Sequence, residues 1–216
     1  MKKTRILTNI SIQSLGYGGV GIAKTEDGKT ILIKGGLPGS VVDVKIVKQK
    51  KEYIEAHITQ VHSVPESLLS GDLKCPHYLY DYLPEQSSLP KHKTGCGGCK
   101  RQAIDYPQQL RLKHDIVLDC CKKLLIHNPQ LEVKPVLGSP KIFAYRNKIE
   151  FSFGKYIQQE KVHKDGNKSE SIQEHRLAGF HRQGAFEKVV DIDQCYLISE
   201  KMHQVYVYLK DILQKS

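Results

Sequence analysis

The sequence contains no tryptophan, two methionines and no long apolar run. Of its 216 residues, 39% are hydrophobic and 26% are charged, which is an ordinary composition for a water-soluble protein. No stretch approaches the roughly 18 apolar residues that cross a membrane. The early apolar segment 6–12 is interrupted by Thr8, Asn9 and Ser11, so it lacks the core of a signal peptide. We therefore expect a cytoplasmic protein without membrane association, and we expect it to be a monomer.

Acidic residues are in the minority: 23 Asp and Glu stand against 33 Lys and Arg, a formal net charge of +10. Residues 1–60 hold ten of the basic residues and five of the acidic ones. A basic surface attracts polyanions, because each neutralised phosphate releases condensed counterions. Many basic proteins have no nucleic-acid partner, so charge alone leaves both possibilities equally open.

Residues 1–64 have the pattern of a small all-β domain. Short β-prone runs are separated by glycine-containing turns, and the Asp27-Gly28 pair between two such runs is typical of a β-hairpin. About five strands in sixty residues favour an OB-like five-stranded β-barrel. The fold class is therefore mainly β or α+β.

The rest of the chain divides into three parts. Residues 65–105 are loop-rich and rich in cysteine, and residues 106–128 predict a helix with one apolar side formed by Leu110, Val117, Cys120, Cys121 and Leu124. Residues 129–216 predict a β-rich central domain with a polar loop at 158–174. It ends in a helix whose apolar stripe is Ile198, Met202, Val205, Leu209 and Ile212.

Four of the six cysteines are candidate metal ligands. Cys96 and Cys99 form a Cys-Gly-Gly-Cys turn, Cys75 precedes it, and Cys195 follows far downstream. A Cys-x-x-Cys turn aims both thiolates at one centre, and its glycines allow N–H groups to approach the sulfurs. The spacing fits a four-cysteine zinc site or a [4Fe–4S] cluster equally well. A redox-active dithiol is disfavoured because the motif lacks a βαβ context.

Several motifs in order resemble the TRAM-domain-bearing, iron–sulfur RNA (uracil-5-)-methyltransferases. They are the N-terminal barrel, then CGGCKRQ at 96–102, YPQQLRLK at 106–113, YRNKIEFSFG at 145–154, LAGFHR at 177–182 and DIDQC at 191–195. The resemblance implies that Cys75, Cys96, Cys99 and Cys195 hold a [4Fe–4S] cluster. The family usually has a short gap after its first cysteine, whereas about twenty residues follow Cys75 here. Either this insertion loops out, which we expect, or Cys75 is no longer a ligand.

The resemblance also implies a methyltransferase domain that uses S-adenosylmethionine with a nucleophilic cysteine and a general base. The second half of the chain has no glycine-rich strand-to-helix turn, and no cysteine has the nucleophile's context. We therefore expect the Rossmann-like methyltransferase domain to be absent and this chain to be inactive by itself. A stand-alone, non-catalytic RNA-binding metalloprotein with iron–sulfur or zinc is the alternative.

Candidate RNA contacts lie in both halves of the chain. Strand ends that offer rings, charges and amides support bases extruded from structured RNA, and basic barrels contact phosphates. These considerations select Tyr17, Lys24, Lys34, Lys48, Lys50, Lys51, Arg146, Lys148, His181 and Arg182. The resemblance implies an RNA substrate, and we favour ribosomal RNA over transfer RNA.

Overall fold

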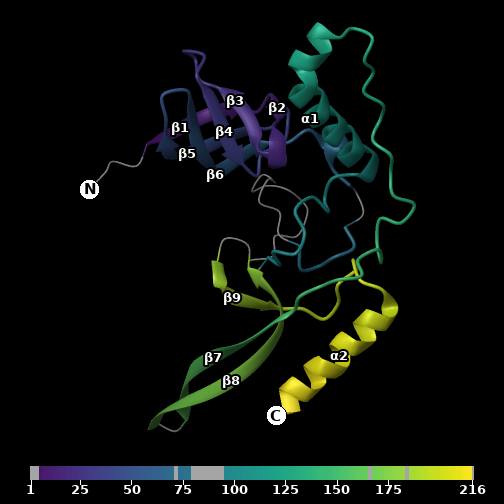
Figure 1. Cartoon of the computed structure of the whole chain (residues 1–216). Coiled ribbons are helices and arrows are strands. Elements are labelled where there is room, and N and C mark those ends of the chain that lie inside the picture. Colours follow the sequence, from purple (N-terminus) through teal and green to yellow (C-terminus); the bar gives the residue numbers. More distant parts are fainter. Residues whose placement is uncertain (1–4, 71–72, 79–94, 165–166, 183–184, 216) are drawn as a thin grey trace. The chain divides into compact units, whose positions relative to one another are not determined.

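The computed structural model describes residues 5–70, 73–78, 95–164, 167–182 and 185–215, with the backbone alone for the strand residues between 156 and 173. The chain forms two compact units (Figure 1). The first unit comprises residues 1–72, 80–90 and 103–138, and the second comprises residues 73–79, 91–102 and 139–216. No helix in the described part of the chain is both long enough and apolar enough to span a bilayer.

The first unit is built around a six-stranded sheet with the order β1-β5-β6-β4-β3-β2. Its strands are β1 (Ile6–Ser11), β2 (Ser14–Leu15), β3 (Gly21–Lys24), β4 (Thr30–Lys34), β5 (Val41–Gln49) and β6 (Tyr53–Ser63). Strand β4 pairs in parallel with β6, and the other neighbours are antiparallel. Two short 3₁₀ turns, η1 (Tyr17–Gly19) and η2 (Glu66–Leu68), complete the connections.

The expectation of five strands was wrong by one. Ser14 and Leu15 form the two-residue strand β2 through pairing with Ile22 and Gly21 of β3. A two-residue strand has no alternation that a sequence pattern could reveal, since its existence depends on the neighbouring strand.

Alternating side chains give this sheet its core. In β3 and β4 every second residue is buried, as expected for strands with one apolar face. The buried cluster consists of aliphatic and alanine side chains: Ile12, Ala23, Ile31, Ile33, Val42, Val44, Ile54, Ala56 and Val61. Packing of this kind needs no polar or metal support.

Helix α1 (Tyr106–His127) lies where the sequence predicted a helix. Pro107 occupies the first turn, where its missing N–H costs no hydrogen bond, and Asn128 ends the helix with its side-chain amide donating to Leu124 O at 2.9 Å. The predicted apolar side was wrong: Leu112 is the buried residue, whereas Val117 and Leu124 are 42% and 54% exposed. Periodicity identifies a helix but not which of its sides finds a partner.

The second unit contains an antiparallel sheet of β7 (Ser152–Lys164), β8 (Asn167–Arg182) and β9 (Ala185–Asp191), followed by α2 (Glu200–Lys215). The expected polar loop at 158–174 was wrong, because β7 and β8 stay paired from Ser152↔Gly179 to Lys164↔Asn167. Backbone hydrogen bonds hold such a hairpin, and a polar sequence without an apolar face gives no sign of them.

Helix α2 also buries a different face from the predicted one. Tyr206 is 2% exposed, whereas Val205, Leu209 and Ile212 of the expected stripe are 59%, 45% and 45% exposed. Tyr206 packs in a small cluster with Ala178, Val190 and Ile192. The helix is therefore held through a tyrosine and, four residues later, through Lys210 at 12% side-chain exposure.

Candidate metal centre

The four candidate cysteine ligands line one pocket, and the pocket lies entirely within the second unit. Cys75, Cys96 and Cys99 come from the loops that precede α1, and Cys195 follows strand β9. The remaining lining residues are His77, Gly98, Gln102, Arg146, Phe180, Ile192, Gln194, Tyr196 and Leu197. The fold thus brings together sulfurs that are up to 120 positions apart in the sequence.

The Cys-Gly-Gly-Cys turn is held by backbone hydrogen bonds to the sheet and to the first cysteine's loop. Cys96 N donates to His77 O at 2.8 Å, and Gly97 N donates to His181 O at 3.1 Å. Gly98 N donates to Cys96 Sγ at 3.3 Å. A Cβ atom at residue 98 would lie 3.3 Å from the same sulfur and 3.6 Å from the ring of Phe180. The glycine therefore lets an N–H group approach the sulfur, as expected from the motif.

The loop of Cys75 is held by the segment that follows the Cys-Gly-Gly-Cys turn. Its backbone N–H donates to Gln102 Oε1 at 3.0 Å. Tyr78, 1% exposed, donates its hydroxyl to Lys100 O at 2.7 Å and so ties this loop to the Cys-Gly-Gly-Cys turn. Burial raises the pKa of the Cys75 thiol, while the backbone N–H groups of His77 and Tyr78 lower it. Hydrogen bonds from N–H groups to sulfur are also one way in which proteins tune a cluster.

Burial disfavours free thiolates at three of the four cysteines, Cys75, Cys96 and Cys99. Burial, with a smaller contribution from the neighbouring thiols, raises the pKa of Cys96 to about 11 and that of Cys99 to about 12. The guanidinium of Arg146 acts in the opposite direction on Cys99. At neutral pH Cys96 and Cys99 are therefore thiols, so a metal that binds them must displace their protons.

Among the described residues, no group of three or more His, Cys, Asp or Glu side chains is placed so that it could hold a metal ion. The pocket is nevertheless lined by four cysteines. Four cysteines are a donor set that both structural zinc sites and [4Fe–4S] clusters use.

Cys120 and Cys121 take no part in this site. Both are free, Cys120 is exposed and Cys121 is partly exposed. Both were predicted to lie on the apolar side of the helix, where a cysteine would be a small buried side chain. This prediction is wrong for Cys120, which is exposed, as are Val117 and Leu124 of the same predicted side.

The candidate RNA contacts of the second unit lie around the pocket or on the sheet beside it. Arg146 lines the pocket, and its backbone N–H donates to Leu197 O at 2.8 Å. Lys148 is 83% exposed and pairs with Glu150 at 3.2 Å. His181 bonds Ser152 Oγ at 2.9 Å and stacks on Phe186 at 3.9 Å, and Arg182 forms an isolated β-bridge with Cys96. Phe186 is 77% exposed and was not selected from the sequence.

The candidate contacts of the first unit are all exposed. Tyr17 is 88% exposed, in a turn where Gly18 and Gly19 adopt positive φ angles of 73° and 75°. The exposed lysines are Lys24, Lys34, Lys48, Lys50 and Lys51. The insertion after Cys75 falls mainly on residues 79–94, which lie outside the described residues.

Comparison with known proteins identifies a domain within the first unit and finds relatives that align with most of the chain. The TRAM domain model matches residues 8–59. An uncharacterized RNA methyltransferase of Chlorobaculum tepidum is 34% identical over 87% of this chain and 35% of its own length. Another from Caldanaerobacter subterraneus is 31% identical over 93% of this chain and 36% of its own length. The chain thus spans about a third of the length of these curated relatives.

A solved structure is also similar. The crystal structure of Pyrococcus abyssi tRNA (uracil-54, C5)-methyltransferase in complex with S-adenosyl-L-homocysteine matches 96% of this chain and 37% of its own, with 23% identity and a TM-score of 0.46. At this score the likeness carries no argument about the present chain.

These matches correct one expectation and confirm another. The expectation that the methyltransferase domain is absent and the chain inactive is contradicted, because proteins named RNA methyltransferases align with 87% and 93% of this chain. The predicted resemblance is confirmed by the TRAM match together with these relatives. The chain thus carries a TRAM domain at residues 8–59 and is similar over most of its length to proteins named RNA methyltransferases.

Proposed function

We propose that this chain binds RNA and holds a [4Fe–4S] cluster in an S-adenosylmethionine-dependent RNA uracil-C5 methyltransferase. One observation carries the proposal: Cys75, Cys96, Cys99 and Cys195 line the same pocket although three separate loops supply them. The motifs that suggested uracil-C5 methylation include Cys96, Cys99 and Cys195, and Cys75 precedes them at a longer spacing than is usual in the family.

The proposed ligands of the cluster are Cys75, Cys96, Cys99 and Cys195. The cluster would supply iron–thiolate bonds that cross-link the loops at 75–99 to the segment at 195. Residues of the chain contribute the N–H group of Gly98 beside Cys96 and the guanidinium of Arg146 beside Cys99. Both would offset the negative charge of four thiolates in a buried site. This role is structural, and it needs no electron transfer.

Anaerobic purification followed by iron, sulfide and zinc analysis tests the cofactor. We expect about four iron and four sulfide per chain and a broad absorbance near 400 nm, because all four ligands are cysteines. Cys195→Ser should lose most of the iron, whereas Cys120→Ser, a change at an exposed free cysteine, should keep it. A colourless protein with one zinc per chain would overturn the iron–sulfur proposal.

RNA binding is proposed to involve both units. The exposed lysines of the TRAM domain would contact phosphates, and Tyr17 would stack on a base. Arg146, His181 and Arg182 would contact RNA near the target uridine, with Lys148 beside them. Chemically, methyl transfer moves a CH₃ group from the sulfonium to C5 and releases the C5 proton to a base. We assign no residue of this chain to that step.

Arg146→Ala should weaken RNA binding by about tenfold at matched salt, since a charge-assisted contact contributes about 1.5–3 kcal/mol. Because Arg146 also lines the cysteine pocket, iron content must be measured on the same sample. Lys201→Ala is the control, because Lys201 is an exposed charge on α2 of the same unit and is not among the candidate RNA contacts. Equal affinities of wild type and Arg146→Ala for a uridine-containing RNA hairpin would contradict the assignment.

The substrate proposal is tested by transfer of a labelled methyl group to RNA. We expect label at C5 of uridine, and we expect ribosomal RNA fragments to be better acceptors than transfer RNA. Label in transfer RNA alone would overturn the choice of substrate. RNA binding without methyl transfer, by a chain that takes up metal, would favour the stand-alone RNA-binding metalloprotein.

A further inference from the structure

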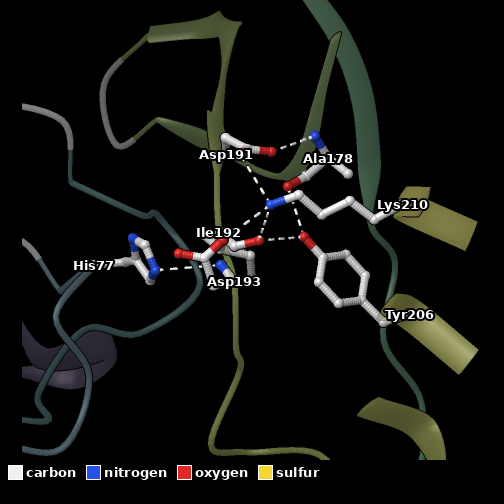
Figure 2. A network of polar contacts seen from close by, with 7 residues as sticks. All are labelled: His77, Ala178, Asp191, Ile192, Asp193, Tyr206 and Lys210. Atoms are coloured by element: carbon white, nitrogen blue, oxygen red, sulfur yellow. Dashed lines mark hydrogen bonds and ion pairs between the residues drawn. The ribbon is translucent and has the colours of Figure 1, made fainter. Parts of the chain in front are cut away.

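A network of polar contacts joins helix α2 to the segment of chain that leads into Cys195 (Figure 2). Lys210 and Tyr206 belong to the helix, and the segment 191–193 begins where strand β9 ends. All of these residues belong to the second unit.

Lys210 donates in three directions. Its ammonium contacts Asp191 Oδ2 at 2.8 Å, Ile192 O at 2.8 Å and Asp193 Oδ1 at 3.2 Å. An ammonium group has three protons, so each proton has one partner. Because these are charge-assisted hydrogen bonds, the ammonium cannot turn away without losing at least one strong contact. The segment 191–193 is therefore held at three consecutive residues by one side chain.

Tyr206, one turn before Lys210 on the helix, makes a second contact with the same segment. Its hydroxyl lies 2.7 Å from Ala178 O and 2.6 Å from Ile192 O, and its one proton is shared between these two carbonyl oxygens. The ring stacks on Phe151 with a centroid distance of 4.2 Å, which fixes the direction of the hydroxyl. Tyr206 thus joins strand β8 to the same carbonyl that Lys210 contacts.

The held segment leads directly to the metal ligands. Ile192 is 1% exposed and itself lines the cysteine pocket, and Cys195 follows Asp193 by two residues. On its other side, Asp193 N donates to His77 Nε2 at 3.4 Å. His77 lies two residues after Cys75, so the segment contacts both α2 and the loop of the first cysteine (Figure 2).

We propose that Lys210 and Tyr206 are positioning residues that hold the segment 191–193 so that Cys195 faces the other three cysteines. The proposal rests on the proposed function, because it assigns the network to the same pocket. Burying an ammonium beside carboxylates costs about as much free energy as the pairing returns, so such a group adds little net stability. Its contacts nevertheless fix the direction of the backbone.

Two variants and one control isolate this effect in the full 216-residue chain. Lys210→Met keeps the unbranched stem and removes the ammonium, and Tyr206→Phe keeps the ring in the core and removes the hydroxyl. Lys215→Met is the control, because Lys215 lies on the same helix, has a 74% exposed side chain and forms an ion pair with Asp211. Far-UV circular dichroism checks that each variant folds.

Amide exchange in the iron-free chain measures how rigidly the segment 191–193 is fixed. We expect the amides of Ile192 and Asp193 to exchange about tenfold faster in Lys210→Met, and severalfold faster in Tyr206→Phe, with no change in Lys215→Met. Unchanged exchange in Lys210→Met, or in Tyr206→Phe if Lys210→Met does not fold, would overturn the proposal.

Loss of iron to a chelator from the reconstituted protein measures the effect on the ligand. We expect the cluster absorbance to decay about tenfold faster in Lys210→Met than in wild type and Lys215→Met. Faster exchange with an unchanged decay would also overturn the proposal, since the segment would then not position the ligand.

If wild type takes up no iron, the cluster proposal fails, and the rate of alkylation of Cys195 in the metal-free chain decides the positioning role. Faster alkylation in Lys210→Met supports it, and equal rates contradict it.

Discussion

The two units differ in what fills their interiors. In the TRAM domain the buried cluster consists of nine aliphatic or alanine residues, such as Ile31 and Val44. The buried cluster of the cysteine-bearing unit has four members among the described residues, and one of them is Tyr206. The first unit is therefore held mainly by apolar packing, whereas the second combines a smaller apolar cluster with directed polar contacts of Tyr206 and Lys210.

Directed contacts and apolar packing respond differently to change. An apolar core loses stability in proportion to the volume removed. When a unit is held by directed hydrogen bonds, the loss of one contact loosens one segment before it destabilises the whole unit, because each contact fixes one segment. Substitutions in the two units should therefore have separate effects, which amide exchange can measure region by region.

The largest effect is expected in the TRAM core. Ile33→Ala should destabilise residues 6–63 by about 2–5 kcal/mol, because Ile33 is 0% exposed and its removal leaves a cavity. Amide exchange should rise throughout this sheet and stay unchanged in residues 174–213. Val47→Ala, at a side chain that is 57% exposed, is the control and should have an effect within about 0.5 kcal/mol. An equal rise of amide exchange in both units would contradict the proposed difference between them.

A smaller effect is expected where β8 meets β9. A Cβ atom added at Gly179 would lie 2.0 Å from Val190 O, so Gly179→Ala must push the two strands apart. We expect a loss of about 1–3 kcal/mol, confined to the cysteine-bearing unit, and measured by amide exchange of β8 and β9. Gly154→Ala meets the side chain of Val189 at 3.0 Å and should cost less, because a side chain can shift. A TRAM domain that loosens equally would contradict the prediction.

The smallest effect concerns a surface pair of the TRAM domain. His62 Nε2 lies 2.7 Å from Asp43 Oδ1, and Asn9 N donates to the same oxygen at 2.9 Å. These hydrogen bonds, with that of His62 the larger, lower the pKa of Asp43 below its usual value. A carboxyl whose pKa is lowered by folding stabilises the protein above its unfolded pKa, and this contribution is lost as the pH falls through the folded pKa.

Asp43→Asn should therefore lower the thermal midpoint slightly at about pH 6, and the difference should shrink as the pH is lowered toward about 2, through the lowered pKa of Asp43 in the folded state. Asp119→Asn, at an exposed position of α1, is the control and should not change the midpoint at either pH. A difference that persists in acid would show that Asp43 acts through something other than its charge.

Part of the fold followed from local sequence. The alternation in β3 and β4 and the Asp27-Gly28 turn predicted the TRAM sheet, and the apolar spacing after Tyr106 predicted α1. These features depend on neighbours in the sequence. The candidate ligands Cys75, Cys96, Cys99 and Cys195 were also selected from their motifs, and the structure brings all four to one pocket.

Other features could not be predicted from the pattern. The β7–β8 hairpin extends through a polar segment, because backbone pairing needs no apolar face. The buried side of α2 has Tyr206 and Lys210 where the spacing favoured Val205 and Leu209. The rule that apolar residues face inward fails here, since the tyrosine hydroxyl and the ammonium find carbonyl and carboxylate partners inside.

The sequence by itself determined the elements that depend on short-range spacing: the TRAM strands, the first long helix and the Cys-Gly-Gly-Cys turn. Only the tertiary structure brings Cys195 to the same pocket as that turn. It likewise places the ammonium of Lys210 against residues 191–193, which lead to Cys195. The physical reason is that periodicity states which side chains share a face, whereas the partner of each face depends on chain segments that are distant in the sequence and close only after folding.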